Sequence, residues 1–578
     1  MTATARHRRA IQLLAAVGIC LLAMGCATIP SSSRPQIIEE TLPPSEPQSQ
    51  GDLRYDAIVP RAGERPEDVV RDFLRVGGSY ERDHARARAY LTRPGSDGWK
   101  DDSRVTLLED APYLEVQGGG SRVLMRGQQQ GRVEADGSYV AGRARYPYAF
   151  RLKKVNGNWR IDNPPSGVLI EAGTFDAAFR AYNIYFLDGT RTRVVPDVRW
   201  FAAARDALPS VLVTAIQQGP SAWLSGAVRS DLEDTTLQSN VEQESDRVKV
   251  YLTGLGEGAD TLPSGGFAQL VWTLNQLGVG GVEVYVDGRL VGPREAPGRS
   301  PQRLSDWRGF DPDGLSVSTP GYFVKNGAVW TTEDAPLAGP AGRSSYGATA
   351  VALSTNRRSL AVLRRAAGGG RTLFVGSVTA LRPRITGTSL TAPTWASTVS
   401  EVWTVQNGHD VVLVPSSGGA TRVVAALDKI GPVRALRLSR DGSRVAVVAG
   451  APGRERLHVG VVIRDNNASV RIAGLKELDV GEEPVSDVSW SDALTLVALA
   501  RAGEQDSALY AVGIDGLSGS RLVSTSGLPG PPSAVAAAPA LPLLAVSANS
   551  LWRTPAADEK WTPVSQRLGP DSAPAYPG

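Results

Sequence analysis

The spacing of hydrophobic residues changes several times along this chain of 578 residues, and each change predicts a segment of different structure. Near the N-terminus an uncharged apolar run over 10–25 follows three arginines and stops at Cys26. This pattern is typical of a signal peptide over residues 1–25, because the run is too short for a comfortable membrane span. No later apolar run approaches 18 residues, so the signal is the only membrane segment that the sequence predicts.

A low-complexity segment follows over residues 26–60. It is rich in Pro, Ser and Gln and shows little periodicity, which predicts a flexible tether. A tether of about 35 residues spans roughly 30 Å as a coil and about 110 Å when fully extended. The folded part of the protein is therefore predicted to stand away from the point at which its N-terminus is held.

The first folded segment, over residues 61–172, begins with a helical pattern. Pro66 and the two acids after it favour a helix start, and apolar residues recur at helical spacing from Val69 to Leu74. A second helix is predicted over 82–91, before Pro94-Gly95 breaks it.

From Val105 onward the apolar period changes to two, which predicts β-strands. The clearest hairpin joins 148–152 to 159–161 through Asn156-Gly157, a dipeptide that suits positive φ at both central positions. Helices followed by a curved antiparallel sheet resemble the cone-shaped NTF2-like domains of bacterial envelope proteins, an α+β fold that often holds a pocket inside the cone. The aromatic residues of the hairpin are interpreted as core residues: Tyr148, Phe150 and Trp159.

Strands and helices then alternate over residues 173–292, which predicts an α/β domain. The predicted elements are strands at 184–187 and 194–199, a helix over 208–218, a strand at 248–252, a helix over 267–277 and a strand at 282–286. Gly219-Pro220 ends the first helix and Asp287-Gly288 ends the last strand. This order resembles the GerMN domain of spore-germination and actinobacterial envelope lipoproteins. The matching pieces are Ala215-Ile216 with Gly219-Pro220, Gln269–Leu274 and Val282–Gly288.

A connector over residues 293–319 is rich in Pro, Arg and Gly. Trp307, Phe310 and Pro312 predict that it packs against a neighbour, because aromatic residues are poor choices for a free linker.

The remainder, residues 320–578, is repetitive. Each unit is an apolar strand, a polar turn and a second apolar strand, and equivalent positions recur roughly every 40 to 52 residues, the length of a four-stranded propeller blade. The units lie at 350–363, 391–405, 433–448, 485–498 and 534–546. The pattern predicts an all-β propeller of about five or six blades, with Tyr322–Val324 closing the ring against the last one. A pair of β-sandwiches stays open as the alternative.

Charge and cysteine content restrict the possible functions. Once residues 1–25 are removed, three arginines leave with them and 59 basic residues balance 59 acidic ones, so electrostatics gives no support for nucleic-acid binding. Of the two cysteines, Cys20 lies in the signal, and the rest of the chain after Cys26 has no thiol and no disulfide.

Candidates for chemistry are few. The histidines outside the signal are scattered (His84, His409 and His458), and no HExxH, GxSxG or P-loop motif is present. We therefore predict no catalytic residues, no metal site and no cofactor. Asp197, Arg199 and Asp287 are polar positions in the GerMN-like segment, and we interpret them as turn and surface residues.

Cys26 is the one predicted modification site. Leu22-Ala23-Met24-Gly25-Cys26 resembles the lipobox of bacterial lipoproteins, although Ala23 stands where that motif usually has Leu. The resemblance implies that the signal peptide is removed and that Cys26 becomes the first residue, with a diacylglyceryl thioether and an N-acyl group such as palmitate. An ordinary signal peptide or an uncleaved anchor is the alternative.

The order of lipobox, helix-plus-sheet domain, GerMN domain and propeller resembles the actinobacterial lipoprotein LpqB family. Cys26–Pro30 and Pro35-Gln36 are also similar to the mature N-terminus of that family. The resemblance implies a non-enzymatic lipoprotein on the extracytoplasmic face of the cell membrane. It also implies a partner, the extracytoplasmic domain of an MtrB-like sensor histidine kinase, and an accessory role in MtrAB-like two-component signalling that influences cell-wall homeostasis and division.

Two other classes of function stay open. A scaffold that binds cell-wall polymer would use exposed tryptophans for stacking on sugars, and the candidates are Trp395, Trp403, Trp490, Trp552 and Trp561. An envelope hydrolase would need paired carboxylates, of which Glu233-Asp234 and Glu482-Glu483 are examples. Adjacent acids on a strand point to opposite faces, so such pairs are poorly placed to flank one bond.

Overall fold

The computed structural model describes residues 59–578 apart from 79–83, 256–260, 367, 397, 426, 466–468, 502–505 and 556–558. The predicted signal peptide, the tether and Cys26 lie outside the described residues.

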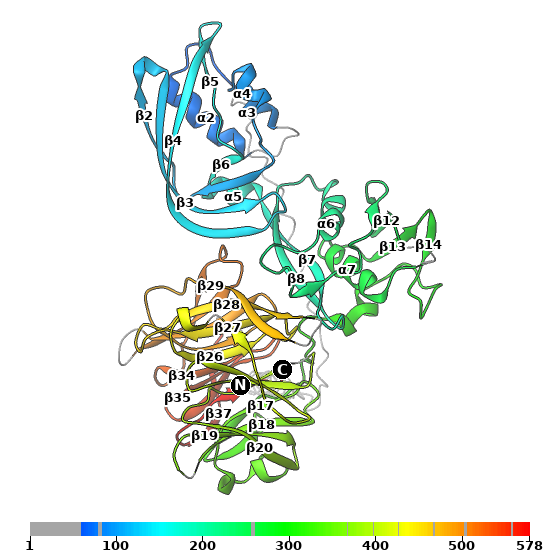
Figure 1. The fold of residues 1–578 in the computed structure, drawn as a ribbon, viewed down its shortest axis with the longest axis vertical. Helices are drawn as coiled ribbons and strands as arrows, with labels where there is room; N and C mark the ends of the chain where they lie inside the picture. The colour runs from blue at the N-terminus through cyan, green and yellow to red at the C-terminus, as the bar shows by residue number, and fades with distance from the viewer. Residues whose placement is uncertain are drawn as a thin grey trace, which may run out of the picture. The chain divides into compact units, whose positions relative to one another are not determined.

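The first domain packs three helices against one face of a bent sheet (Figure 1). The helices are α2 (Pro66–Gly77), α3 (Ala85–Arg88) and α4 (Arg93–Asp97). The strands are β1 (Arg104–Leu108), β2 (Tyr113–Gln117), β3 (Arg122–Glu134), β4 (Tyr139–Val155), β5 (Asn158–Ile161) and β6 (Val168–Glu171). They run in the order β5-β4-β3-β1-β6, and β2 pairs with β3. Phe73 of α2 meets Trp99 and Phe150 in the core, with ring centroids 5.4 and 6.3 Å away.

Most of the predicted local structure in this domain is confirmed. Helix α2 begins at Pro66, and the β4–β5 turn has φ of 50° at Asn156 and 81° at Gly157. The long second helix is wrong, because α3 covers Ala85–Arg88. Pro94 does not break a helix but lies in the first turn of α4, where its missing N–H costs nothing and Thr92 caps the helix through the N–H of Gly95. The NTF2-like cone stays a prediction.

The second domain contains two sheets and two long helices. Strand β7 (Arg180–Asp188) pairs with β8 (Val194–Phe201) and β9 (Val228–Arg229). A five-stranded sheet is built from β10 (Thr236–Leu237), β11 (Glu242–Glu244), β12 (Arg247–Thr253), β13 (Gly281–Val286) and β14 (Arg289–Val291). Helices α6 (Leu208–Gln217) and α7 (Ser264–Asn275) share a buried core with both sheets, and α5 (Ala172–Ala178) leads in from the first domain. The predicted strands and helices are all present, with bounds shifted by a few residues.

The connector after β14 packs as predicted. Its 3₁₀ helix η4 (Leu304–Phe310) places Trp307 against Phe267 of α7, with nearly parallel rings 5.8 Å apart. Trp307 is only 6% exposed, so the connector belongs to the core of the second domain.

The described residues between 322 and 575 form six small sheets. The first contains β15 (Tyr322–Lys325), β16 (Ala328–Thr331) and β38 (Pro574–Ala575). The others contain β17–β20 (348–387), β21–β24 (394–422), β25–β29 (424–478), β30–β33 (485–523) and β34–β37 (532–566). In these five, neighbouring strands pair antiparallel, except that β25 runs parallel to β29.

Hydrophobic clusters join each of the six sheets to the next. Trp395 of β21 packs with Leu363 and Leu373 of the preceding sheet, and Trp490 of β30 packs with Leu457 of the sheet before it. Phe323 of β15 packs with Leu544 of the sixth sheet and so completes a ring. Tyr322 pairs with Ala575 and Phe323 with Pro574, so the C-terminal strand β38 belongs to the first sheet. The prediction that Tyr322–Val324 closes the ring against the last sheet is confirmed. The arrangement is propeller-like.

A buried ion pair connects the first two domains. Arg199 is fully buried, and its guanidinium lies 2.8 Å from the carboxylate of Asp197. It also donates to the backbone carbonyls of Asp136 in the first domain (2.6 Å) and of Gly219 after α6 (3.1 Å). Ser221 donates to Asp197 through both its N–H and its hydroxyl. The interpretation of Asp197 and Arg199 as turn and surface residues is therefore wrong.

A second contact joins the GerMN-like domain to the propeller-like region. Arg444, paired with Asp441 at 3.1 Å, donates to the carbonyl of Pro196 in β8. Trp223 donates its indole N–H to the carbonyl of Gly474 at 2.7 Å, and the Lys476 ammonium lies 4.0 Å from its ring centroid. Burial lowers the pKa of Lys476 to about 8.

Replacing Arg199 with Met is expected to destabilise the protein by about 3–5 kcal/mol, because the Asp197 carboxylate stays buried without its partner. Thermal and urea unfolding of purified protein measure the effect. The control is the double variant R199M with Asp197→Asn, which removes both charges and should recover a substantial part of the loss. Equal unfolding of the single and double variants would contradict a charge-pairing role.

Replacing Trp223 with Ala is expected to loosen the contact between the GerMN-like domain and the propeller-like region, since it removes the indole hydrogen bond and the ring beneath Lys476. Tryptic cleavage at arginines of the connector over 293–319 should then become several-fold faster. Trp552→Ala is the matched control, because Trp552 is also half-buried and donates to a carbonyl, that of Ser547, but within its own sheet. Equal cleavage rates in the two variants would show that Trp223 does not hold this contact.

Candidate functional site

The sheet of the GerMN-like domain leaves one face uncovered by its helices. Val248, Val250, Leu252, Val282 and Val284 point into the core shared with α6 and α7, and the alternate residues of β12 and β13 point the other way. We call the outward residues the open sheet face: Lys249, Tyr251, Glu283, Tyr285 and Leu290.

Two tyrosines form the centre of the open sheet face. Tyr251 and Tyr285 lie directly opposite each other in the parallel pair β12–β13, with stacked rings 4.7 Å apart. Leu290 of β14 pairs with Tyr285 and is 50% exposed, so the aromatic pair continues into an exposed aliphatic side chain. Rigid aromatic side chains on a sheet are typical of protein-recognition surfaces.

Carboxylates hold the two phenol groups in place. Tyr251 donates to Glu242 at 3.3 Å and Tyr285 donates to Glu283 at 3.1 Å. Loss of hydration and the neighbouring Glu283 raise the pKa of Tyr285, so its hydroxyl stays protonated. The open sheet face therefore offers an apolar centre with a polar rim that includes Lys249.

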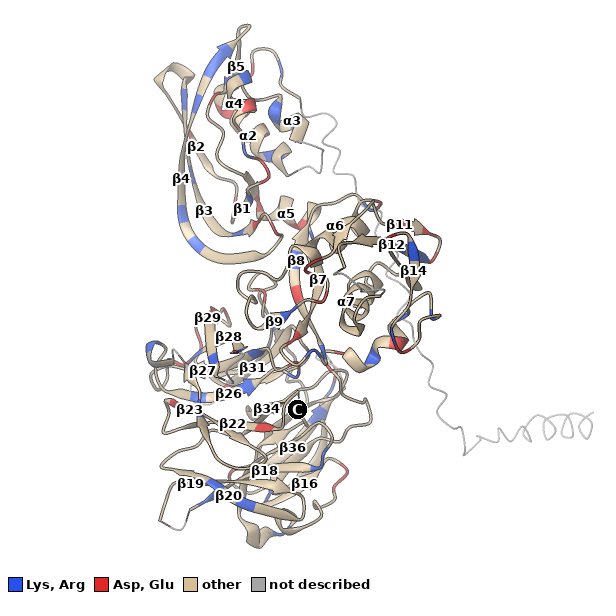
Figure 2. Ribbon diagram, turned by 45° about the vertical axis from the view of Figure 1, so that its right-hand side comes forward, with Lys and Arg blue, Asp and Glu red and all other residues tan. Residues whose placement is uncertain are grey.

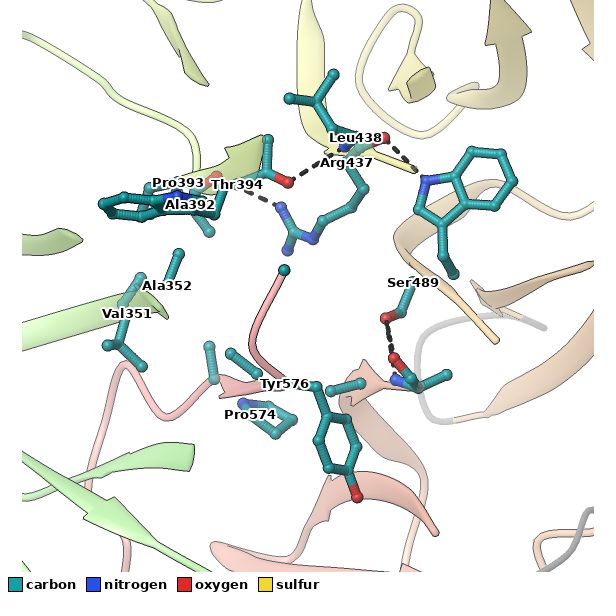
Figure 3. A pocket seen from close by; sticks show the side chains of 18 of the residues that line it. Val351, Ala352, Ala392, Pro393, Thr394, Arg437, Leu438, Ser489, Pro574 and Tyr576 are labelled. Atoms are coloured by element: carbon teal, nitrogen blue, oxygen red, sulfur yellow. Dashed lines mark hydrogen bonds between the residues drawn. The ribbon is translucent and has the colours of Figure 1, made fainter. Parts of the chain in front are cut away.

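A cavity lies where strands of the sheets in the propeller-like region meet (Figure 3). Its volume is about 600 Å³, counting the mouth open to solvent. Arg437 extends into it and donates to the carbonyl of Ala392 at 3.4 Å, while Asp487 balances its charge at the same distance. The segment 573–576 lines one wall, where the Tyr576 hydroxyl donates to the carbonyl of Pro542. None of the described residues lining this cavity is His, Asp or Glu.

The buried Arg440 lines this cavity, and the half-buried Asp313 of the connector interacts with its charge. Arg440 is 8% exposed, and burial lowers its pKa to about 10. Burial raises the pKa of Asp313 in the connector to about 7, and the nearby Asp492 and Asp311 add to the shift.

A second cavity, of about 790 Å³, opens between the first domain and β8. Its lining includes His84, Asp101 and Trp200. Asp101 accepts a hydrogen bond from His84 at 3.1 Å and lies 2.8 Å from the Arg88 guanidinium. Burial acts to raise the pKa of Asp101, but these contacts hold it below its usual range. A mixed polar and apolar lining of this kind suits a small amphipathic ligand.

The other predicted positions do not gather into a catalytic arrangement. Asp287 lies in the turn after β13 with φ of 47°, as interpreted. Glu233 and Asp234 line a surface cavity beside Arg191, and Glu482 is fully exposed beside Arg456. His458 is buried, where burial lowers its pKa, and His409 is exposed. Among the described residues no three His, Cys, Asp or Glu side chains are grouped so as to hold a metal ion.

The tryptophans considered for sugar stacking are mostly core residues. Four of them are at most 4% exposed: Trp395, Trp403, Trp490 and Trp561. Trp552 is half-buried and bonded to the backbone of its own sheet. Sequence analysis does not identify Tyr251 and Tyr285 as site residues. The pattern that points to them is that each tyrosine alternates with apolar core residues along its strand and so occupies a solvent-side position.

No helix within the described part of the chain is long and apolar enough to cross a membrane.

Three family models match the chain. They are the Lipoprotein LpqB N-terminal domain over residues 59–176, a domain of sporulation and spore germination over 183–292, and the Lipoprotein LpqB beta-propeller domain over 323–577. The solved structure of tandem GerMN domains of the sporulation protein GerM from Bacillus subtilis is 20% identical and covers 22% of this chain and 45% of that chain, with a TM-score of 0.19.

Curated relatives match over nearly the whole length. Lipoprotein LpqB of Rhodococcus jostii is 28% identical over 97% of both chains. Lipoprotein LpqB of Mycolicibacterium smegmatis is 29% identical over 97% of this chain and 98% of the relative. With two LpqB domain models and the intervening germination-type domain in the same order, the chain belongs to the LpqB lipoprotein family.

Proposed function

We propose that this protein is a lipid-anchored, non-enzymatic accessory regulator of an MtrB-like sensor histidine kinase, on the extracytoplasmic face of the cell membrane. The observation that carries the proposal is the open sheet face, where a partly exposed, stacked tyrosine pair adjoins the exposed Leu290 on a domain joined to both of its neighbours. Family membership supports the lipoprotein part of the proposal, since the curated relatives are named lipoproteins.

The anchor is proposed at Cys26, after removal of a signal peptide. Two or more acyl chains hold a protein on a bilayer stably, whereas one chain is marginal. An anchored regulator shares a two-dimensional surface with a membrane kinase, so the effective concentration of each partner is high even when the contact area is small.

The kinase contact is proposed at the open sheet face. Tyr251 and Tyr285 lose little conformational entropy on binding because their rings are already stacked and their hydroxyls already bonded. Regulation requires different affinities for two states of the kinase, because equal affinity shifts no equilibrium. A rigid face favours such discrimination, since it cannot adapt to both states equally.

The finer fold assignments belong to the same proposal. The bent sheet around α2 supports an NTF2-like first domain, and the ring of six sheets supports a six-bladed propeller. Both would act as rigid supports for recognition surfaces.

A wall-polymer scaffold is less well supported. Four of the five tryptophans on which it relied are buried, so they offer no sugar-stacking platform. The proposal of a non-enzyme is supported by the scatter of His84, His409 and His458 over three parts of the described chain.

Replacing Cys26 with Ser is expected to abolish acylation and release the protein from the membrane fraction. Mass spectrometry of the N-terminal peptide and fractionation of cells measure the two effects. Cys20→Ser is the matched control and should leave the mature protein unchanged, because the signal is removed. Membrane retention of the C26S variant with an intact signal would indicate an uncleaved anchor instead.

Replacing Tyr251 and Tyr285 with Ala is expected to weaken binding to the kinase ectodomain by about 30-fold, the typical cost of an aromatic hot spot. Titration of purified kinase ectodomain measures the affinity, and photo-crosslinking from position 290 in cells identifies what is captured. Tyr113→Ala is the control, since Tyr113 is a 63% exposed tyrosine on another sheet. Glycan or unrelated proteins as the main adducts would overturn the kinase proposal.

A further inference from the structure

Positive charge is concentrated in one part of the first domain. Between Gly118 and Arg160 the chain carries nine Lys and Arg residues and two acidic ones, although the protein as a whole is nearly neutral. This stretch forms β3, β4 and β5, and Figure 2 shows Lys and Arg recurring along β4 from its bend to the turn with β5.

Strand register places most of these charges on one side of the sheet. Val123, Met125, Phe150, Leu152 and Ile161 are buried in the core, so the alternate residues face outward. We call the outward cationic residues the basic face: Arg122, Arg126, Arg145, Arg151, Lys153 and Arg160.

Like charges are paired directly across the strands of this face. Arg122 lies opposite Arg151, and Lys153 lies opposite Arg160. Such pairs are destabilising in an isolated sheet. Glu115 pairs with Arg126 and Asp162 with Lys153, but no carboxylate of the described residues lies within 4.0 Å of Arg122, Arg145 or Arg151. The face therefore carries an uncompensated positive charge that an anionic surface would neutralise.

The chain enters the domain beside this face. The N–H of Gly63 donates to the side-chain carbonyl of Asn158 at 3.0 Å, at the start of β5, the strand that carries Arg160. Cys26 lies 37 residues before Gly63 in the sequence. The segment that leads to the proposed anchor thus begins next to the basic face.

We infer that the basic face docks on the anionic phospholipid headgroups of the bilayer to which the chain is anchored. The inference rests on the proposed lipid anchor, which brings the domain close to a bilayer. Each Lys or Arg near an anionic membrane surface adds to binding, and the attraction fades beyond a Debye length of about 8 Å at physiological salt. Charges spread along the outer side of a long, bent sheet match an extended anionic surface better than a single peptide.

Flotation of the full-length protein with vesicles tests the inference. Neutral vesicles contain phosphatidylcholine alone, and anionic vesicles contain equal parts of phosphatidylcholine and phosphatidylglycerol. A photo-crosslinking residue at Pro147, which lies exposed between Arg126 and Arg145 on this face, reports headgroup contact as lipid adducts. The test variant is R122Q/R145Q/R151Q. The matched control is R289Q/R358Q/R382Q, three exposed arginines on the other domains.

We expect about tenfold more lipid adducts at position 147 on anionic than on neutral vesicles. This excess should disappear in the test variant and at about 1 M salt, and it should remain in the control variant. Equal adduct yields on the two vesicles, or an excess that survives the test variant, would overturn the inference. Flotation with neutral vesicles reports the anchor separately. If the protein does not float with neutral vesicles, the lipid anchor is not supported, and flotation with anionic vesicles then tests the basic face alone. Flotation that the test variant abolishes supports docking by the basic face, and a lack of flotation with anionic vesicles overturns it.

Discussion

The buried guanidinium of Arg199 is the constraint on which the arrangement of the first two domains depends. A desolvated cation is costly unless charges and carbonyls surround it, and its partners come from the GerMN-like domain (Asp197 and Gly219) and from the first domain (Asp136). All of these groups must be in place together, because removing one leaves a buried charge uncompensated. The interaction thus selects one arrangement of the two domains over looser alternatives, and the open sheet face and the basic face are parts of one scaffold.

Local structure was largely predictable from residue spacing. The alternation of apolar residues predicted β12 and β13, Gly219-Pro220 predicted the end of α6, and Asn156-Gly157 predicted the β4–β5 turn. The errors arose where local signals were overridden. Pro94 was expected to break a helix, but the preceding Thr92 caps the new helix that it begins.

Long-range features were less predictable, because they depend on which strands become neighbours. Arg199 and Asp136 are 63 residues apart, so nothing local shows that they meet. The same is true of Tyr251 and Tyr285, whose stacking requires the parallel register of β12 and β13. The basic face shows as a charge excess in the sequence, but only the register of β3, β4 and β5 shows which residues share a side.

The pairing of β15 with β38 has a consequence for biosynthesis. Two strands about 250 residues apart in the sequence must meet before the ring of sheets is complete. The entropy cost of closing this long loop therefore falls late in folding, and the ring gains little stability before that step. A nascent propeller-like region therefore stays open until nearly all of it has emerged. In the export across a membrane that we propose, this delay would protect export competence, and the interval just after translocation would be the period of greatest exposure to proteases.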